Sequence, residues 1–193
     1  MSLVLTAGPD VEPVSLVEAK AHLRVDGSAE NTLISSLIIT SRLHVEAALG
    51  LALITQSWSY FLDAWPASGP HVRLPLRPVQ SVAAVQLYAA DESVETLSPT
   101  IYLLDGAAVP PRLVRQGSLP WPPPKRTANG IEIAFKAGFG DAAGDIPAPI
   151  RQAVLLLVAH WYEHREPIEI GAAHTAVPHM VSELLHPYRQ VNL

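Results

Sequence analysis

The stretch PIRQAVLLLVAHWYEHRE, residues 149–166, decides how the fold is interpreted. Pro149 suits the first turn of a helix, where the N–H that proline lacks would have no partner. The residues from Val154 to Ala159 are apolar on every side of such a helix, so we expect several neighbours to bury it. Pro167 should end it. The stretch therefore predicts a long helix that packs against the other helices of the chain.

The end of this helix spells H-x-x-E-H, the inverted zinc-protease signature. His160 and His164 stand four residues apart and share one helical face, and Glu163 would be the general base acting on a zinc-bound water. A zinc enzyme also needs a third protein ligand. The candidates that follow the motif are Glu166, Glu169, His174, His179 and Glu183.

The same motif has a structural interpretation, which we favour. His160, His164 and Arg165 would belong to the polar end of the helix, where cationic side chains complement the helix dipole. Trp161 and Tyr162 would anchor that end in the core or in an interface. We therefore predict no catalytic residue, no metal site and no cofactor, and we keep a zinc-dependent hydrolase as the alternative.

Two further helices are expected near the N-terminus. Ser15 and Glu18 form an S-x-x-E capping box at the start of a short helix over residues 16–23. Apolar residues then recur at helical spacing over residues 31–49, and Gly50 is a plausible C-terminal stop. We expect this second segment to be the main N-terminal helix.

From Gln56 to Phe139 the pattern changes to short runs rich in β-branched and aromatic residues, bounded by Gly, Pro, Asp or Ser. No helical pattern alternates with these runs, so their strands should pair as antiparallel hairpins, one of them turning at ADES, residues 90–93. We predict an α+β fold. Residues 1–54 and 140–193 form a helical body in which the N- and C-terminal helices pack as a small bundle, and residues 55–139 form an inserted antiparallel β subdomain.

Composition narrows the classes of function. The 193 residues include 13 Lys and Arg against 18 Asp and Glu, a net charge of −5. Such a chain is poorly suited to gripping phosphate backbones or anionic membrane surfaces. The absence of cysteine excludes disulfides, thiolate catalysis and cysteine-ligated zinc. We see no leader segment and no apolar run that could span a bilayer, so we expect a soluble protein.

Two loop segments look structural. KAGFGDAAGD, residues 136–145, has glycines but no phosphate-loop lysine, and we interpret it as a turn into the last long helix, with Asp141 and Asp145 as turn and cap residues. LPWPPPKR, residues 119–126, reads as a stiff surface loop, with a polyproline-type ligand as the alternative.

Taken in order, these segments resemble a known family. PVSLVEAKAHLRVD, HVEAALGLALITQSW, LPLRPVQSVAAVQLY, IEIAFKAGFGD and IPAPIRQAVLLLVAHWYEHRE, followed by a final helix ending in PYR, are similar to head–tail connector proteins of long-tailed bacteriophages. These proteins are also called adaptor or head-completion proteins, and related copies occur in prophages and gene transfer agents. The resemblance runs from about Pro13 to Arg189. The family commonly has Asn at the position of His164, which weakens the zinc interpretation.

The resemblance implies a structural protein of the virion that is not an enzyme. Several copies, a dodecamer on the portal protein, would form a ring that extends the DNA channel and offers a surface to further head-completion or tail proteins. DNA would pass through without specific binding, which an acidic wall favours. No membrane is involved. The protein would be made in the bacterial host cytoplasm and act at the head–tail junction.

The resemblance also implies that the C-terminal segment docks on the portal, for which we name Tyr188, Arg189, Val191 and Leu193, with a frayed terminus as the alternative. Trp121, set among prolines, is our candidate for another interface, because aromatic residues are favoured there. A further alternative for the whole chain is a β-sandwich binding module from another part of a virion.

Overall fold

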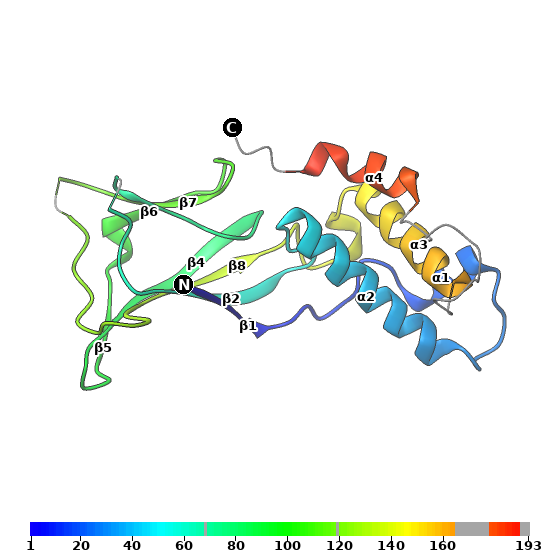
Figure 1. The fold of residues 1–193 in the computed structure, drawn as a ribbon, viewed down its shortest axis with the longest axis horizontal. Coiled ribbons are helices and arrows are strands. Elements are labelled where there is room, and N and C mark those ends of the chain that lie inside the picture. The colour runs from blue at the N-terminus through cyan, green and yellow to red at the C-terminus, as the bar shows by residue number, and fades with distance from the viewer. Residues whose placement is uncertain (68, 119, 165–177, 190–193) are drawn as a thin grey trace, which may run out of the picture. The chain divides into compact units, whose positions relative to one another are not determined.

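The computed structural model describes residues 1–67, 69–118, 120–164 and 178–189. Within these residues it contains four α-helices and two antiparallel sheets, which confirms the predicted α+β class (Figure 1). The chain divides into a β unit, residues 1–9 and 50–139, and a helical unit, residues 10–49 and 140–193. We had assigned residues 1–54 to the helical body. Residues 2–7 instead form a strand that pairs within the β unit.

The β unit contains eight strands in its described residues. They are β1 (Ser2–Ala7), β2 (Gln56–Leu62), β3 (His71–Arg73), β4 (Val79–Tyr88), β5 (Val94–Thr96), β6 (Tyr102–Asp105), β7 (Arg112–Arg115) and β8 (Ile131–Ala137). One sheet has the order β1-β2-β8-β4-β5 and the other β3-β7-β6. Strands β4 and β5 turn at residues 89–93, where Ser93 N–H donates to Asp91 Oδ1 at 3.1 Å, so the expected hairpin at ADES is confirmed.

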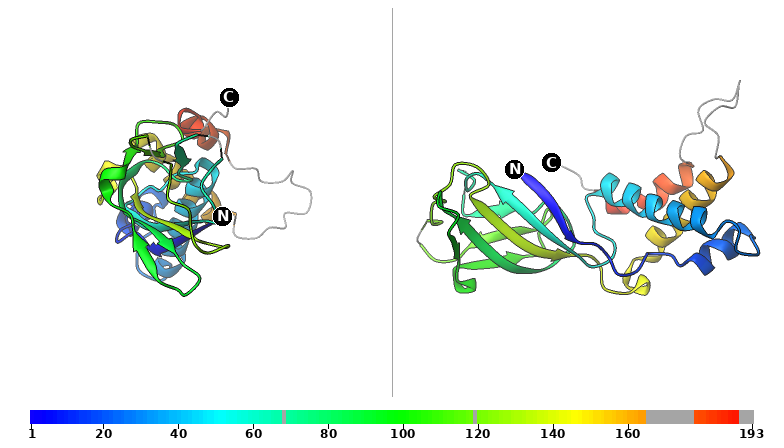
Figure 2. Two further views of the ribbon diagram at one scale, coloured as in Figure 1. Left: turned by 90° about the vertical axis from the view of Figure 1, so that its left-hand side faces the viewer. Right: turned by 90° about the horizontal axis from the view of Figure 1, so that it is seen from below.

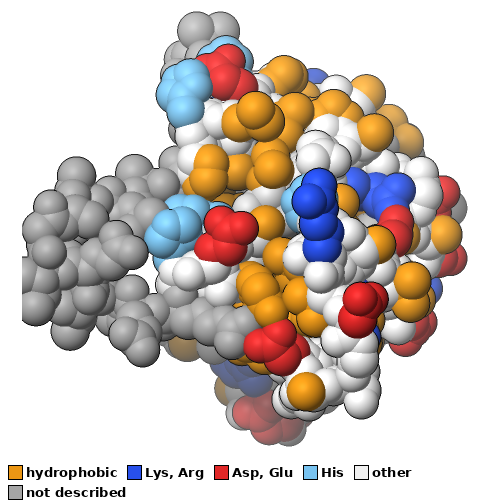
Figure 3. Space-filling view, turned by 90° about the vertical axis from the view of Figure 1, so that its right-hand side faces the viewer, with side chains coloured by type: hydrophobic (Ala, Val, Ile, Leu, Met, Phe, Trp, Pro, Cys, Tyr) orange, Lys and Arg blue, Asp and Glu red, His pale blue; other side chains and the backbone are white. Residues whose placement is uncertain are grey.

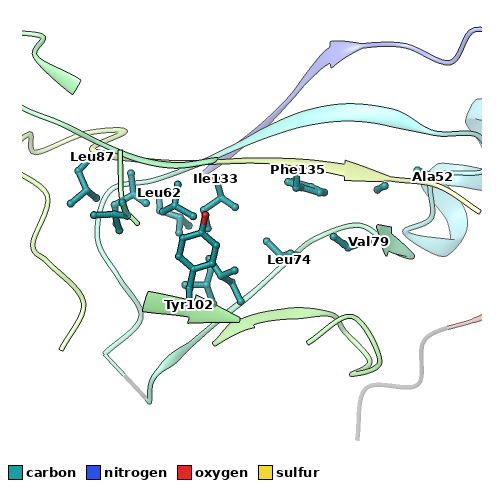
Figure 4. Close-up of a cluster of buried hydrophobic side chains, with 14 residues drawn as sticks. Ala52, Leu62, Leu74, Val79, Leu87, Tyr102, Ile133 and Phe135 are labelled. Carbon is teal, nitrogen blue, oxygen red and sulfur yellow. The ribbon is translucent and has the colours of Figure 1, made fainter. Parts of the chain in front are cut away.

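The core of the β unit lies between these two sheets. Strand β8 alternates strictly: Ile133 and Phe135 are buried, whereas Lys136 is exposed on the other side. The side chains of Leu113 on β7 and Tyr102 on β6 join the same cluster from the three-stranded sheet. Figure 4 shows Tyr102 pointing between the sheets toward the side chains of the five-stranded sheet. Hydrophobic burial between the sheets is thus the main stabilisation of this unit.

The chain leaves β8 through a position that only glycine fits. Gly138 has φ +143°, and a Cβ there would lie 2.5 Å from the backbone nitrogen of Thr55. The missing side chain lets the residues after β8 run directly against residues 54–55, with Phe139 N–H donating to Leu53 O at 3.1 Å. The turn predicted over residues 136–145 begins at Gly138, and within it Ala142 N–H donates to Asp145 Oδ2 at 2.9 Å.

The helical unit contains α1 (Leu16–Leu23), α2 (Asn31–Leu49), α3 (Ala148–Glu163) and α4 (His179–Leu185). The capping box at α1 is formed as predicted, with Glu18 N–H donating to Ser15 Oγ at 3.1 Å and Ser15 N–H donating to Glu18 Oε2 at 2.9 Å. Helix α2 ends before Gly50, whose φ of +63° is the left-handed stop that the sequence indicated.

Helix α3 contacts each of the other three helices (Figures 1 and 2). Ile150, Val154, Leu157 and Val158 are fully buried in it, which is why the sequence is apolar on several sides. The helix ends at Glu163 rather than at Glu166 as expected, because the backbone of His164 leaves the helical region with φ −109° and ψ 61°. No helix among the described residues combines the length and the apolar character needed to cross a bilayer.

Candidate functional site

The histidine motif lies at the C-terminal end of α3. The rings of His160 and His164 are 4.7 Å apart between centroids, so the four-residue spacing does bring them together. His164 is turned back onto its own helix. Its backbone N–H lies 3.1 Å and its ring Nδ1 2.8 Å from the carbonyl oxygen of His160. The backbone N–H makes the last hydrogen bond of the helical pattern, and the ring Nδ1 donates to the same carbonyl, so the His164 side chain caps the helix end.

The ligand set of a zinc enzyme is not assembled among the described residues, where no group of three or more His, Cys, Asp or Glu side chains could hold a metal ion. Glu163 is exposed. On α4, His179 Nε2 lies 3.5 Å from Glu183 Oε1, so these two candidates face each other. Glu166, Glu169 and His174 lie outside the described residues.

The aromatic residues of the motif hold the end of α3 within the helical unit. The Trp161 ring meets His44 of α2 edge to face, at 5.5 Å between centroids. The Tyr162 hydroxyl donates to the carboxylate of Glu30, just before α2. Both side chains are half-buried. The H-x-x-E-H segment thus combines a capped helix end with two aromatic anchors, as the structural interpretation expects.

The proposed docking residues are only in part described. Tyr188 closes a short 3₁₀ turn, His186–Tyr188, that follows α4, and its side chain is half-buried. Arg189 is exposed. Val191 and Leu193 lie outside the described residues, so their role stays a prediction.

Trp121 belongs to an aromatic cluster on the loops of the β unit. Its ring stacks on Trp65 with centroids 4.2 Å apart and the planes 14° from parallel, and the Arg115 guanidinium lies 5.9 Å from its centroid. Trp121 Nε1 donates to Pro70 O at 3.2 Å, and Trp65 Nε1 donates to Pro122 O at 2.7 Å. Because both indole N–H groups already have partners, the cluster ties two loops together, and only the indole faces remain for a partner.

Sequence reasoning missed a charged cluster on the inner side of α2. Arg42 and Glu46 are 7% and 9% exposed. The Arg42 guanidinium donates to Glu46 Oε2 and Glu12 Oε2, both at 2.8 Å. Burial opposes the charged form of Arg42, but hydrogen bonds and charge attraction from Glu12 and Glu46 outweigh it and raise the pKa of the guanidinium above its ordinary value. This cluster fastens the segment before α1 to α2.

The signal for this arrangement was present in the spacing. Arg42 and Glu46 fall on the same helical face as Ile38, Val45 and Leu49, so charged residues share the buried side. The opposite side of α2 carries exposed Ile39 and Leu43. Figure 3 looks onto the helical unit and shows hydrophobic side chains gathered among acidic, basic and histidine side chains.

No protein-family profile and no curated protein matches the chain. Solved structures do match. A chain in the neck of an empty gene transfer agent (GTA) particle, computed with C6 symmetry, is 28% identical with a TM-score of 0.85. A chain in the virion of a native GTA particle is 29% identical with a TM-score of 0.84. A chain in the neck of a native GTA particle, computed with C12 symmetry, is 29% identical with a TM-score of 0.78. Each match covers 100% of this chain and 97% of the other.

Proposed function

We propose that this chain is a structural protein of the neck of a phage-like particle, acting as a head–tail adaptor. Several copies assemble as a ring below the portal protein, extend the DNA channel and connect the head to further head-completion or tail proteins. The observation that carries the proposal is the match to GTA neck chains over 100% of this chain and 97% of the matched chain at a TM-score of 0.85. The match covers the β unit and the helical unit alike.

Symmetry supports the ring. The matched necks were computed with C6 and C12 symmetry, which arranges identical copies around an axis. Rings close by head-to-tail contacts, in which one face of a copy meets a different face of the next. The net charge of −5 suits a channel that lets DNA pass, because an acidic wall does not hold phosphates.

Docking on the portal through the C-terminal segment extends this proposal. Arg189 is exposed beyond α4, where a partner can reach its guanidinium. Arg189→Ala should weaken portal binding without changing stability, since exposed substitutions away from special features alter stability by less than about 0.5 kcal/mol.

The test uses the full chain and a portal protein from the same source, mixed in solution and imaged by electron microscopy. We expect a ring of this protein on one face of the portal, with the symmetry of the portal. Serum albumin in place of this protein controls for adventitious density. A portal that stays bare at saturating concentrations of the chain would contradict the adaptor role. Assembly onto tail or baseplate protein instead would favour a binding module from another part of the virion.

A further inference from the structure

One face of α2 is unusual for a helix at the surface. It consists of Ser36, Ile39, Thr40, Leu43, His44 and Ala47, all exposed, and we call it the outer face of α2. Ile39 and Leu43, one helical turn apart, are 42% and 52% exposed. The exposed side of a surface helix usually carries charged residues, so this face needs an explanation.

The outer face has no Asp, Glu, Lys or Arg. The helix has only two such residues, Arg42 and Glu46, and both are buried and paired with each other on the opposite side. The other helices each place a carboxylate in solvent: Glu18 on α1, Glu163 on α3 and Glu183 on α4. Helix α2 therefore keeps both of its charged side chains on its buried, otherwise mainly apolar face and leaves its exposed side without charge.

The polar atoms of the outer face are also largely occupied. Ser36 Oγ donates to Leu33 O at 2.7 Å, and Thr40 Oγ1 donates to Ser36 O at 2.8 Å. These hydroxyls bond to their own helix, so covering them leaves no donor unpaired. The His44 ring already contacts Trp161 at 5.5 Å. A partner could therefore bury this face without a large cost in polar desolvation.

We propose that the outer face of α2 is the surface through which each copy of this chain packs against a neighbouring copy in the ring. The proposal rests on the proposed function, because the symmetry of the matched necks makes a second copy the expected neighbour. The face carries no Asp, Glu, Lys or Arg, so packing it against the next copy leaves no charged side chain of this face buried without a partner. Ring closure requires that the face meet a different surface of the next copy.

The experiment compares ring assembly by the full-length wild-type chain with that of Leu43→Glu and Ile39→Glu. Assembly onto a portal protein from the same source is followed by native mass spectrometry and electron microscopy over a concentration series. Glutamate keeps the helix propensity of α2 but places a charge in the contact. We expect the concentration for half-maximal assembly to rise at least about tenfold, the change that loss of one central contact residue typically gives. Circular dichroism and the unfolding midpoint should stay as in wild type.

The matched control is Leu103→Glu on β6, where the leucine is 53% exposed, nearly as in Leu43. This variant should assemble like wild type. If Leu43→Glu and Ile39→Glu form rings as well as wild type, the inference is overturned and the adaptor role stays intact. The same holds if Leu103→Glu loses ring assembly to the same extent as the two α2 variants. Wild-type protein that forms no ring on the portal would instead remove the proposed function, and this inference with it.

Discussion

Helices α2 and α3 lie side by side in one unit and both bury an apolar face, but they differ in where their charged residues lie. Helix α3 buries Leu157 and Val158 and keeps its histidines at the end, where His164 caps the last turn. Helix α2 buries Arg42 and Glu46 and exposes Ile39 and Leu43. The helix with a recognisable motif is thus explained by packing and capping. Helix α2 has no recognisable motif, but its outer face is an uncharged surface that the helical unit leaves exposed.

Removal of the buried cation of α2 should have the largest effect on the stability of the helical unit. Arg42→Met removes the cation that Glu12 and Glu46 share, and we expect a loss of about 3–5 kcal/mol in the free energy of unfolding, because removing one member of a buried ion pair is strongly destabilising. Chemical denaturation measures it. In the triple variant with Glu12→Gln and Glu46→Leu, most of the loss should return. A loss below about 1 kcal/mol for Arg42→Met, the range of an exposed ion pair, would show that the cluster is not buried in solution.

Replacing one leucine by alanine in each helix should give very different losses in the free energy of unfolding. Leu157→Ala in α3 should cost about 2–5 kcal/mol, since it opens a cavity at a fully buried position. Leu43→Ala in α2 should change the free energy of unfolding by less than about 0.5 kcal/mol, since that side chain is 52% exposed. The same denaturation series measures both. Equal losses at the two positions would mean that the outer face of α2 is covered within a single chain.

A smaller effect concerns the contact between α1 and α3. Hydrogen bonds from the Ser15 backbone and side chain, and the charge of Arg151, hold the pKa of Glu18 below its ordinary value of 4.5. A depressed carboxyl pKa adds stability above the unfolded value, and this is lost as pH falls through the folded value. Glu18→Gln should therefore cost less than about 1 kcal/mol at pH 7, because the carboxylate is 45% exposed. The difference from wild type should vanish below the folded pKa. If Glu18→Gln lowers the free energy of unfolding equally at pH 3 and pH 7, the loss comes from packing and not from the charge of the carboxylate.

The smallest expected effect is at the histidines of α3. His160→Ala should alter the free energy of unfolding by less than about 1 kcal/mol, and protein purified without added zinc should hold no stoichiometric metal before or after the change. Elemental analysis by mass spectrometry measures this. If wild type holds stoichiometric zinc and His160→Ala loses it, the interpretation as a zinc-dependent hydrolase would be favoured again.

Much of the fold could be predicted from local signals. The capping box of Ser15, the stop at Gly50 and the hairpin at residues 90–93 are set by a few neighbouring residues. The sequence analysis missed strand β1. It lies at the edge of the sheet and pairs only with β2, so its alternation of buried and exposed side chains is short and weak, and β2 is far along the chain. The end of α3 was placed too late because His164 closes the helix with its own side chain.

The candidate surfaces were harder to predict. The stacking of Trp65 on Trp121 joins residues far apart in sequence, so Trp121 alone indicated an aromatic loop residue and not a pair. The spacing of Arg42 and Glu46 places them on the apolar face of α2, but the pairing of Arg42 with Glu12 depends on the path of the chain before α1, which no local pattern predicts.

The most direct test of the account measures whether the outer face of α2 becomes covered when the copies assemble. The chain has no cysteine, so Thr40→Cys provides a single reactive thiol on that face, and Leu103→Cys provides one on β6 as the control. Maleimide labelling rates are compared for free protein and for protein assembled on the portal. We predict that labelling at position 40 slows at least about tenfold on assembly, as for a contact that contributes on the order of 1.4 kcal/mol, while position 103 is unchanged. Equal labelling of position 40 in free and assembled protein would contradict the account.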